Sequence, residues 1–365
     1  MPTKQDLQRL RKHLYLAIFT IAVLVGAINV QLIRAYHTPE TADLNDMEQH
    51  EMSDSYILGT LSDSWSHNHT DILLLSEQEG WVFLKHPIEF NMSTFTGYNS
   101  YLLQDSDAQK LQIDNILQSV YIASSTKLSV FVHYGRQADA TFFIPVDKCA
   151  HEYTIPMHNF CEKSLGKITL IAPYNDAEVT ITLRQVAGTV EFNGKVYNSG
   201  NNMSVQVPRH KILTIGHNTS LSGTTMHSTT PVCVLAGTGC KDGQTTCKSV
   251  ITTVLPSSQL SRFFIVPNVV TNRSRLQLVS TEDNNNVVIH RYSNKEQLIL
   301  KTSQTYDIDL IGREPTVITS DRDIIVTVLA RPVETDLFLL WIVGVDQYRS
   351  SYRFFYTVVR SQLHP

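Results

Sequence analysis

No lysine or arginine occurs between Arg34 and Lys85, although that segment contains ten acidic residues. The acidic residues are concentrated there, so the chain from Lys85 onward is close to neutral despite the net charge of −4. The sequence also has no stripe of basic residues that could release counterions from a nucleic-acid backbone. The composition therefore gives no support to DNA or RNA binding.

The short motifs of common enzyme chemistries are absent as well. The sequence has no GxSxG elbow, P-loop, dinucleotide fingerprint or CxxC pair. The nearest approach to a zinc-protease motif is His151, Glu152 and His158. The two histidines are seven residues apart with Pro156 between them, whereas a zincin needs them four apart on one helical face. We therefore expect no enzyme activity, no metal site and no cofactor.

The longest uncharged apolar run lies near the N-terminus. Residues 14–33 carry no charge, and as a helix they would span roughly 30 Å, the thickness of a hydrocarbon core. Four basic residues precede this run and an acidic segment follows it, so the positive-inside bias keeps the N-terminus cytoplasmic. We expect a cytoplasmic tail at residues 1–13, a transmembrane signal anchor at residues 14–34, and a type II protein of the plasma membrane.

A cleaved secretory signal peptide is the alternative, because Val25 and Ala27 have the spacing of a small-residue cleavage site. The length of the apolar run, which Leu32 and Ile33 extend, favours the uncleaved anchor. In the alternative the protein is secreted. Both interpretations place the downstream chain in the same extracellular compartment.

Residues 35–70 are polar and acidic and show no sustained hydrophobic periodicity. This composition predicts a solvated stalk that holds the folded part away from the bilayer. Beyond the stalk, the chain has enough apolar residues to bury a core of ordinary size, at 42% hydrophobic content overall.

Short alternating runs dominate the chain from about residue 81 onward. In residues 178–184, for example, the apolar side chains fall on one face and the two threonines on the other, which is typical of a half-buried strand. Asn193 and Gly194 form a hairpin signal, since a type I′ turn needs positive φ at both central positions. Many short strands without a good amphipathic helix indicate an all-β fold of the sandwich type.

A weak internal repeat is visible among these strands. Residues 168–181 align with residues 276–289 as strand, polar turn and strand, and residues 227–236 resemble residues 319–330. The duplication predicts two stacked β-sandwich-like subdomains. Their expected bounds are residues 71–250 and 251–365.

The five cysteines all follow the apolar run, and in an oxidising compartment near neighbours are natural disulfide partners. We expect Cys149 to pair with Cys161, and Cys240 to pair with Cys247. Cys233 is then left over, either as a buried free thiol or as the site of an intermolecular disulfide.

Sequons for N-glycosylation occur at Asn68, Asn91, Asn202, Asn218 and Asn272. Each asparagine is followed two residues later by serine or threonine, with no proline between them. The predicted topology places these sequons in the lumen of the secretory pathway. We therefore expect a glycoprotein.

An aromatic cluster follows the apolar run at residues 338–345, which is too short to span a bilayer and predicts a core strand. The cluster consists of Tyr348, Tyr352, Phe354, Phe355 and Tyr356. If some of these side chains are exposed, they form an aromatic contact surface; core packing is the alternative.

The middle of the chain resembles a known family. Residues 221–256 contain an LSGT turn, a strand that opens with Pro-Val, a glycine, two close cysteines and a valine-rich segment ending in Leu-Pro. In this order the motifs resemble the N-terminal domain of the IgGFc-binding proteins. The resemblance continues through residues 262–270, takes in residues 142–156 upstream, and covers about residues 120–359.

This resemblance implies a secreted or surface-exposed β module of the kind found in mucus-type and cell-surface adhesive proteins. We therefore expect an extracellular recognition or adhesion module that binds a protein or glycoprotein partner, in the setting of innate immunity. A structural matrix or coat component is the alternative, in which the chain forms homo-oligomers through sheet edges or through Cys233.

Overall fold

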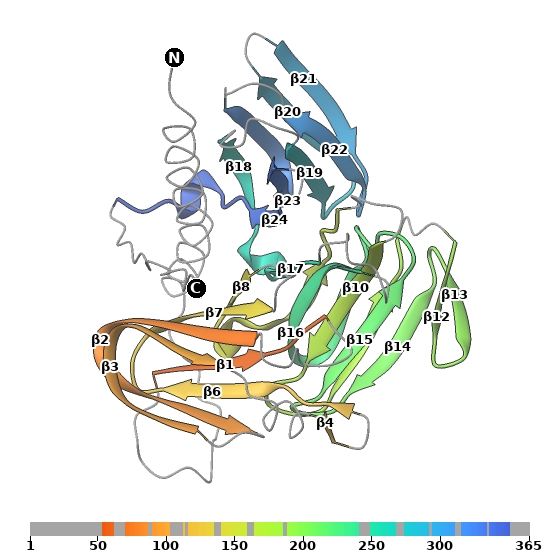
Figure 1. Ribbon diagram of the computed structural model, residues 1–365. Helices are drawn as coiled ribbons and strands as arrows, with labels where there is room; N and C mark the ends of the chain where they lie inside the picture. Colours follow the sequence, from red (N-terminus) through yellow and green to blue (C-terminus); the bar gives the residue numbers. More distant parts are fainter. Residues whose placement is uncertain are drawn as a thin grey trace.

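The computed structural model describes residues 53–61, 70–86, 90–102, 112–113, 116–134, 140–158, 164–184, 188–240, 249–267, 274–291, 294–310, 315–333 and 336–350. Within these residues the fold is all-β, as predicted, and consists of strands with three short 3-10 helices (Figure 1). The predicted tail and anchor, residues 1–34, lie outside this part of the chain. Among the described residues, no helix has the length and apolar character needed to cross a membrane.

Three antiparallel sheets follow one another along the chain, and we call them the first, second and third β units. The first comprises β1 (Asp54–Leu58), β2 (Thr70–His86), β3 (Phe90–Leu102), β6 (Val120–Ser124), β7 (Leu128–Tyr134) and β8 (Ala140–Phe143). The second comprises β9 (Ala150–Thr154), β10 (Ser164–Ile171), β11 (Ala177–Thr182), β14 (Asn202–Val207), β15 (Ile212–His217), β16 (Thr225–Cys240) and β17 (Val250–Thr253).

The third β unit comprises β18 (Ser261–Val266), β19 (Ser274–Ser280), β20 (Asn285–Arg291), β21 (Asn294–Leu300), β22 (Thr305–Leu310), β23 (Thr316–Val333) and β24 (Asp336–Trp341). Two small hairpins complete the strands: β4 (Gln112–Ile113) with β5 (Ile116–Leu117), and β12 (Thr189–Phe192) with β13 (Lys195–Asn198). The latter turns at Asn193 and Gly194, both at positive φ, as the hairpin signal predicts.

The three units share one pattern of strand pairing. In the third unit, the first half of β23 pairs with β18 and β20 and its second half with β19 and β24, while β21 and β22 form the edges. The second unit repeats this pattern around β16, with β9 and β11 on its first half, β10 and β17 on its second, and β14 and β15 at the edges.

The first unit has the same pattern of strand pairing, but its strands are divided at different places. β2 takes the places of β10 and β11, β3 takes those of β14 and β15, and β6 with β7 replaces the long strand β16. The predicted repeat therefore corresponds to equivalent strands of the second and third units. The described chain holds a third copy that the predicted division into two subdomains does not contain.

Two of the predicted boundaries need correction. Residue 250 begins the paired strand β17, so the division between the second and third units falls after this strand rather than before it. The solvated stalk at residues 35–70 is wrong at β1, where Tyr56, Ile57 and Leu58 are buried. These three side chains add to the core, and β1 gains a ladder with β6, which outweighs the polar composition around it.

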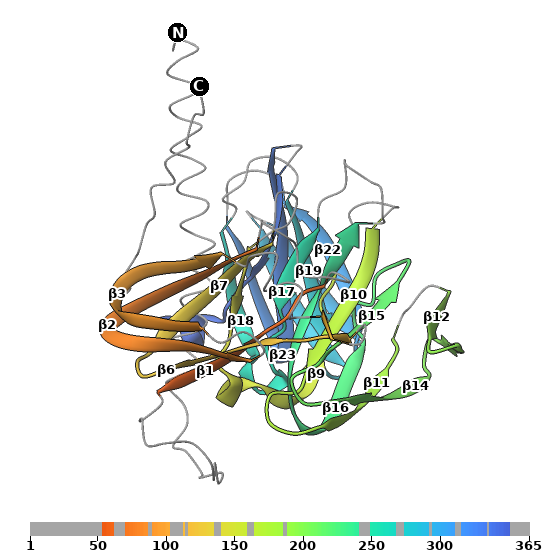
Figure 2. The same ribbon diagram turned by 60° about the horizontal axis from the view of Figure 1, so that its bottom comes forward.

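A 3-10 helix comes directly after the last strand of each unit. η1 (Val146–Lys148), η2 (Ser257–Gln259) and η3 (Val345–Gln347) follow β8, β17 and β24. Each begins after an extended residue, Pro145, Pro256 or Gly344. η1 contacts β1, η2 contacts β9 and η3 contacts β18, so each 3-10 helix packs against the first strand of its own unit. Figure 2 shows the strands of the first unit on one side, those of the second on the other, and β18, β19, β22 and β23 of the third between them in the view.

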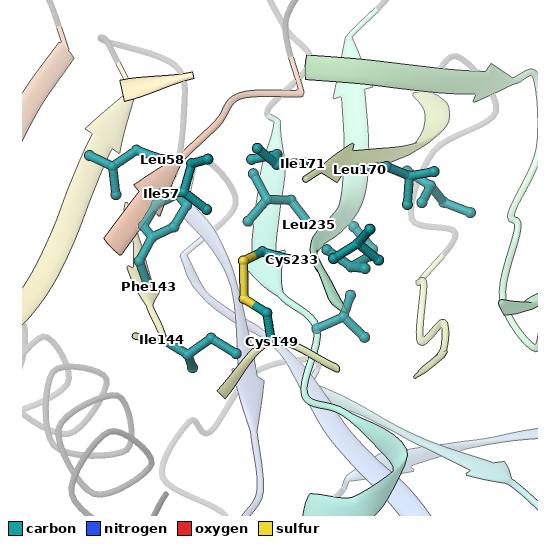
Figure 3. Packing of buried hydrophobic residues seen from close by; sticks show 14 of the residues in the cluster. Ile57, Leu58, Phe143, Ile144, Cys149, Leu170, Ile171, Cys233 and Leu235 are labelled. Carbon is teal, nitrogen blue, oxygen red and sulfur yellow. A yellow bond between two sulfur atoms is a disulfide. The ribbon is translucent and has the colours of Figure 1, made fainter. Parts of the chain in front are cut away.

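The buried side chains form two cores. The first and second units share one cluster, to which Val279, Ile325 and Trp341 of the third unit also belong. Figure 3 shows where the first two units meet: Ile57 and Phe143 of the first lie near Ile171 and Leu235 of the second. The third unit has a cluster of its own, which includes Phe264. The first two units thus behave as one packed body, and burial of these apolar side chains is the main stabilising contribution.

A disulfide joins Cys149 to Cys233, with their Cα atoms 4.9 Å apart (Figure 3). The predicted pairing of Cys149 with Cys161 is therefore wrong, because β9 pairs with β16 and brings these two positions together across 84 residues. Cys233 is neither a free thiol nor a site for an intermolecular disulfide. Cys161 and Cys247 lie outside the described residues, and the pairing of Cys240 with Cys247 stays a prediction.

Candidate binding surface

An apolar face lies on the outside of the third β unit, where β18, β23, β20 and β21 run side by side. Alternate residues of each strand point into the core, so the residues between them point outward. The cross-strand register places Phe263 opposite Thr319, and Thr319 opposite Val288. We define the outer face of the third unit as Phe263, Ile265, Val317, Thr319, Val288, His290, Lys295, Gln297 and Ile299.

The apolar members of this face are accessible to solvent. Phe263 is 41% exposed and Ile265 is 36% exposed, while Val288 and Val317 between them and β21 are half-buried. The register places Ile265 opposite Val317 and leaves Val288 diagonal to Val317, so apolar side chains of three neighbouring strands lie side by side, in contrast to the single exposed apolar residues that are normal on any surface. Such a patch is typical of a protein contact site.

The strand that presents Phe263 is held from both sides. Its inward residues Phe264 and Val266 are buried in the core of the third unit. At its start, the Ser261 hydroxyl donates to the Asp346 carboxylate in η3, and the Gln347 side chain donates to the Gln259 carbonyl at 3.0 Å. β18 is therefore fixed in position before any partner binds, which limits the ordering entropy that binding would cost.

Tyr348 extends the apolar surface beyond η3. Its side chain is 45% exposed, and its hydroxyl lies 3.5 Å from the carbonyl oxygen of Ile265. Tyr348 is thus an exposed member of the predicted aromatic cluster. The other four aromatic residues of that prediction lie outside the described residues.

The polar members of the outer face lie mainly on β20 and β21. His290 and Lys295 are exposed and stand opposite each other across the two strands. Gln297 donates a hydrogen bond of 2.8 Å to Asn286. Across the patch, Arg262 beside Phe263 forms an ion pair of 2.8 Å with Asp323. The patch therefore has an apolar centre with a polar rim, the usual arrangement of a protein interface.

The second β unit carries polar residues at the equivalent positions. Glu152 takes the place of Phe263, His227 that of Thr319, and Thr180 that of Val288. Glu152 and His227 lie 3.5 Å apart on this exposed face. The fold is thus compatible with a polar outer face, and the apolar side chains of the third unit are not required to form the sheet.

The histidines of the rejected zinc motif lie in different environments. The His151 ring nitrogen Nδ1 lies 2.9 Å from the carbonyl oxygen of Ser228, whereas Nε2 of His158 lies 2.9 Å from the hydroxyl of Thr327 in the third unit. Burial, followed by the charge of Arg275, lowers the pKa of His158 to about 3. Across the described ranges, no three potential metal ligands come together.

Two predicted glycosylation sites can be placed on the surface. Asn202 and Asn218 are both exposed, and Asn202 accepts a hydrogen bond of 2.9 Å from the hydroxyl of Thr182. Asn91 lies in β3, and Asn68 and Asn272 lie outside the described residues. Exposure is a requirement for modification, and modification itself stays a prediction.

The sequence could not identify the outer face. Residues 262–266 are predicted as a strand, but two neighbouring phenylalanines give no sign of which one points outward. The register with β23 decides this, because it directs Phe264 into the core and Phe263 to solvent.

Comparisons with known proteins place this face within a shared region. A family model described as IgGFc binding protein matches residues 139–361, more than half of the chain, and confirms the resemblance seen in the sequence. The human protein named IgGFc-binding protein is 28% identical over 142 residues, which are 39% of this chain and 3% of that protein. No solved structure matches the chain. The matched region includes the second and third units and lies beyond most of the first.

Proposed function

Because this chain belongs to the IgGFc binding protein family, we propose that it is an extracellular binding module that holds a protein partner on the outer face of its third β unit. One observation carries this proposal. The apolar centre at Phe263, Ile265, Val288 and Val317 is exposed or half-buried, while the equivalent sheet of the second unit is polar. No catalytic role is proposed.

The partner is a protein or glycoprotein with an apolar patch of matching size. Phe263 and Tyr348 supply aromatic area, which is enriched among the residues that dominate binding energy. The relative's name indicates that it binds the Fc part of immunoglobulin G, so purified Fc is the first partner to test. We propose further that the module is displayed on the cell surface by the predicted anchor at residues 14–34.

The test is a binding measurement with the full chain produced in mammalian cells and purified in detergent. Immobilised Fc and a panel of purified extracellular glycoproteins serve as probes. For any probe that binds, Phe263→Ser should weaken binding at least about tenfold, which corresponds to about 1.4 kcal/mol. Val196→Ser is the matched control, because Val196 is an apolar side chain, 62% exposed, on the β12–β13 hairpin away from the outer face.

Two results would overturn the proposal. Binding that Phe263→Ser and Ile265→Ser leave unchanged would show that the partner uses another surface. Failure of the entire panel to bind would remove the evidence for a recognition role. Phe263 is 41% exposed, so its replacement also removes some packing. Circular dichroism and thermal unfolding should therefore show that the variant is folded at the temperature of the binding measurement, so that loss of binding does not reflect unfolding.

The cell-surface location needs a separate test. Intact cells that express the chain with a C-terminal epitope should stain without permeabilisation, and glycosidase treatment should increase the electrophoretic mobility of the protein. A chain that is found in the cytosol with unmodified asparagines would refute the extracellular proposal.

Structural self-association is the second candidate function. An intermolecular disulfide at Cys233 does not support it, because Cys233 is bonded to Cys149 and is only 6% exposed. Self-association through a sheet edge is supported by the edge strand β21 of the third unit.

A further inference from the structure

β21 is an edge strand with an open side. Within the described chain it pairs with β20 alone, and Figure 1 shows it at the periphery of the molecule. Ile299 near its end is 67% exposed. An edge strand presents unpaired backbone N–H and C=O groups, which form a template for one more strand. The natural occupant of this edge is therefore an extended segment of polypeptide.

The equivalent edge of the second unit carries features that oppose such pairing. The register of the repeats matches Lys295, Gln297 and Ile299 of β21 with Asn202, Ser204 and Gln206 of β14. The β14 residues are all polar and exposed, Asn202 begins a sequon, and Pro208 follows the strand. A glycan at Asn202 would block an incoming strand. In the first unit, β3 also carries a sequon, at Asn91.

β21 has none of these features. Its sequence NKEQLIL contains no sequon and no proline, and an isoleucine replaces the glutamine of β14. Glu296 is engaged on the inner side, where it hydrogen-bonds Arg291 at 3.2 Å and the hydroxyl of Tyr306. Among the equivalent edge strands β3, β14 and β21, β21 is thus the one that carries no sequon.

The β21 sequence is complementary to itself in one antiparallel register. With a two-fold axis at Gln297, the two Gln297 amides face each other, and each amide can donate to and accept from the other. Lys295 then lies opposite Ile299 of the second copy, and its aliphatic stem covers that apolar side chain. If the two-fold axis passes through Glu296 instead, Glu296 lies opposite Glu296 of the second copy, and the like charges destabilise this register.

We propose that two copies of this chain associate through antiparallel pairing of their β21 strands about a two-fold axis at Gln297. The two third-unit sheets then form one continuous sheet, with both outer faces on it. A two-fold contact of this kind is closed, because each copy uses its only open β21 edge in the contact. The inference is independent of the identity of the partner that the outer face binds.

Cysteine substitution at the proposed axis gives a direct test. The Gln297→Cys variant of the full chain, purified and treated with oxidised glutathione, should give a disulfide-linked dimer on a non-reducing gel. Gln206→Cys is the control, because Gln206 is exposed on β14, the equivalent edge strand of the second unit, and its replacement leaves the sequon at Asn202 intact. On the non-reducing gel it should run as a monomer, as should the unsubstituted chain, which also shows whether the native cysteines cross-link.

Light scattering then tests the association without a cross-link. The unsubstituted chain should approach the mass of two copies as its concentration rises, and Ile299→Lys should raise the dissociation constant of the dimer at least about tenfold, since it places a second lysine opposite Lys295. Equal cross-linking of the two cysteine variants, or a monomer at every concentration, would overturn the proposal. If Phe263→Ser changes partner binding but still dimerises, the result bears on the outer-face proposal and leaves the dimer proposal supported.

Discussion

Gln277 and Met157 form two hydrogen bonds of opposite direction between the third and second β units. The Met157 N–H donates to Oε1 of Gln277 at 3.1 Å, and Nε2 of Gln277 donates to the Met157 carbonyl at 3.1 Å. Oε1 also accepts from the hydroxyl of Ser222, and Nε2 also donates to Asp307. The buried amide of Gln277 therefore uses its full hydrogen-bonding capacity to join the two units.

Replacement of Gln277 by leucine should destabilise the protein strongly. The substitution removes the four hydrogen bonds of the Gln277 amide from a buried site, each worth about 0.5–1.5 kcal/mol, although the Met157 N–H keeps the Ser222 hydroxyl and the Met157 carbonyl keeps the Ser220 hydroxyl. We expect the free energy of unfolding, measured by denaturant titration, to fall by at least about 2 kcal/mol. The exposed Gln206→Leu is the control and should change it by less than about 0.5 kcal/mol. Equal effects would mean that the amide is not essential at this junction.

The sequence predicts the second and third units well because their turns are recognisable. Residues 172–176 and 281–284 separate two short strands in each unit, and both turns are rich in polar residues. In the first unit the corresponding polar segment is residues 76–80, but it lies inside the continuous strand β2, which spans the length that β10 and β11 divide. Its membership of the repeat depends on strand pairing over long distances, which local periodicity does not contain.

The disulfide shows the same limit. Proximity in sequence favours Cys161 as the partner of Cys149, but the partner is Cys233, because the curled sheet brings β9 beside β16. Chain entropy favours short loops only weakly, by an amount that grows with the logarithm of loop length. The geometry of the folded sheet therefore decides the pairing.

Removal of this disulfide should lower the free energy of unfolding, because the unfolded chain gains conformational entropy without the cross-link. A closed loop of 84 residues between Cys149 and Cys233 corresponds to about 4–5 kcal/mol in the chain-entropy model. The double variant Cys149→Ala, Cys233→Ala should lose a comparable free energy of unfolding. Mass spectrometry of non-reduced peptides should find Cys149 linked to Cys233 in the unsubstituted chain. A peptide that links Cys149 to Cys161 instead would refute this connectivity.

Gly223 is required by both its backbone conformation and its surroundings. Its φ is +79°, and a Cβ atom there would lie 2.2 Å from the carbonyl oxygen of Ser303 in the third unit. Gly97 has a similar φ of +83° with open space around it, so it isolates the backbone effect. Gly97→Ala should cost about 1 kcal/mol of unfolding free energy, and Gly223→Ala clearly more, at least about 2 kcal/mol. Equal losses would show that the Ser303 contact imposes no constraint.

His158 should make the protein sensitive to acid. It is buried where the second unit meets the third, its Nε2 contacts the Thr327 hydroxyl, and its Nδ1 has no hydrogen-bond partner among the residues that the structure describes. The charge of Arg275 on β19 lowers the pKa of His158 further. A protonated imidazolium would therefore lie between the units without compensation.

The direction of the pH effect is set by the two pKa values. The pKa of His158 falls from about 6.5 to about 3 on folding, so between these values the unfolded chain binds a proton that the folded chain does not. The stabilising contribution of the neutral ring is complete above pH 6.5 and is lost progressively as the pH falls toward 3. The loss approaches about 1.4 kcal/mol for each pH unit within this window.

The His158→Gln variant separates this residue from the other titrating groups. A glutamine side chain has no proton to gain in this range, so the decrease in unfolding free energy between pH 7 and pH 4.5 should be smaller in His158→Gln than in the unsubstituted chain by roughly 2 kcal/mol. His227→Gln is the control, because His227 is exposed on the outer face of the second unit and should keep the full pH dependence. If His158→Gln shows the same decrease as the unsubstituted chain, acid sensitivity originates in other groups, and the junction of the second and third units does not respond to pH through His158.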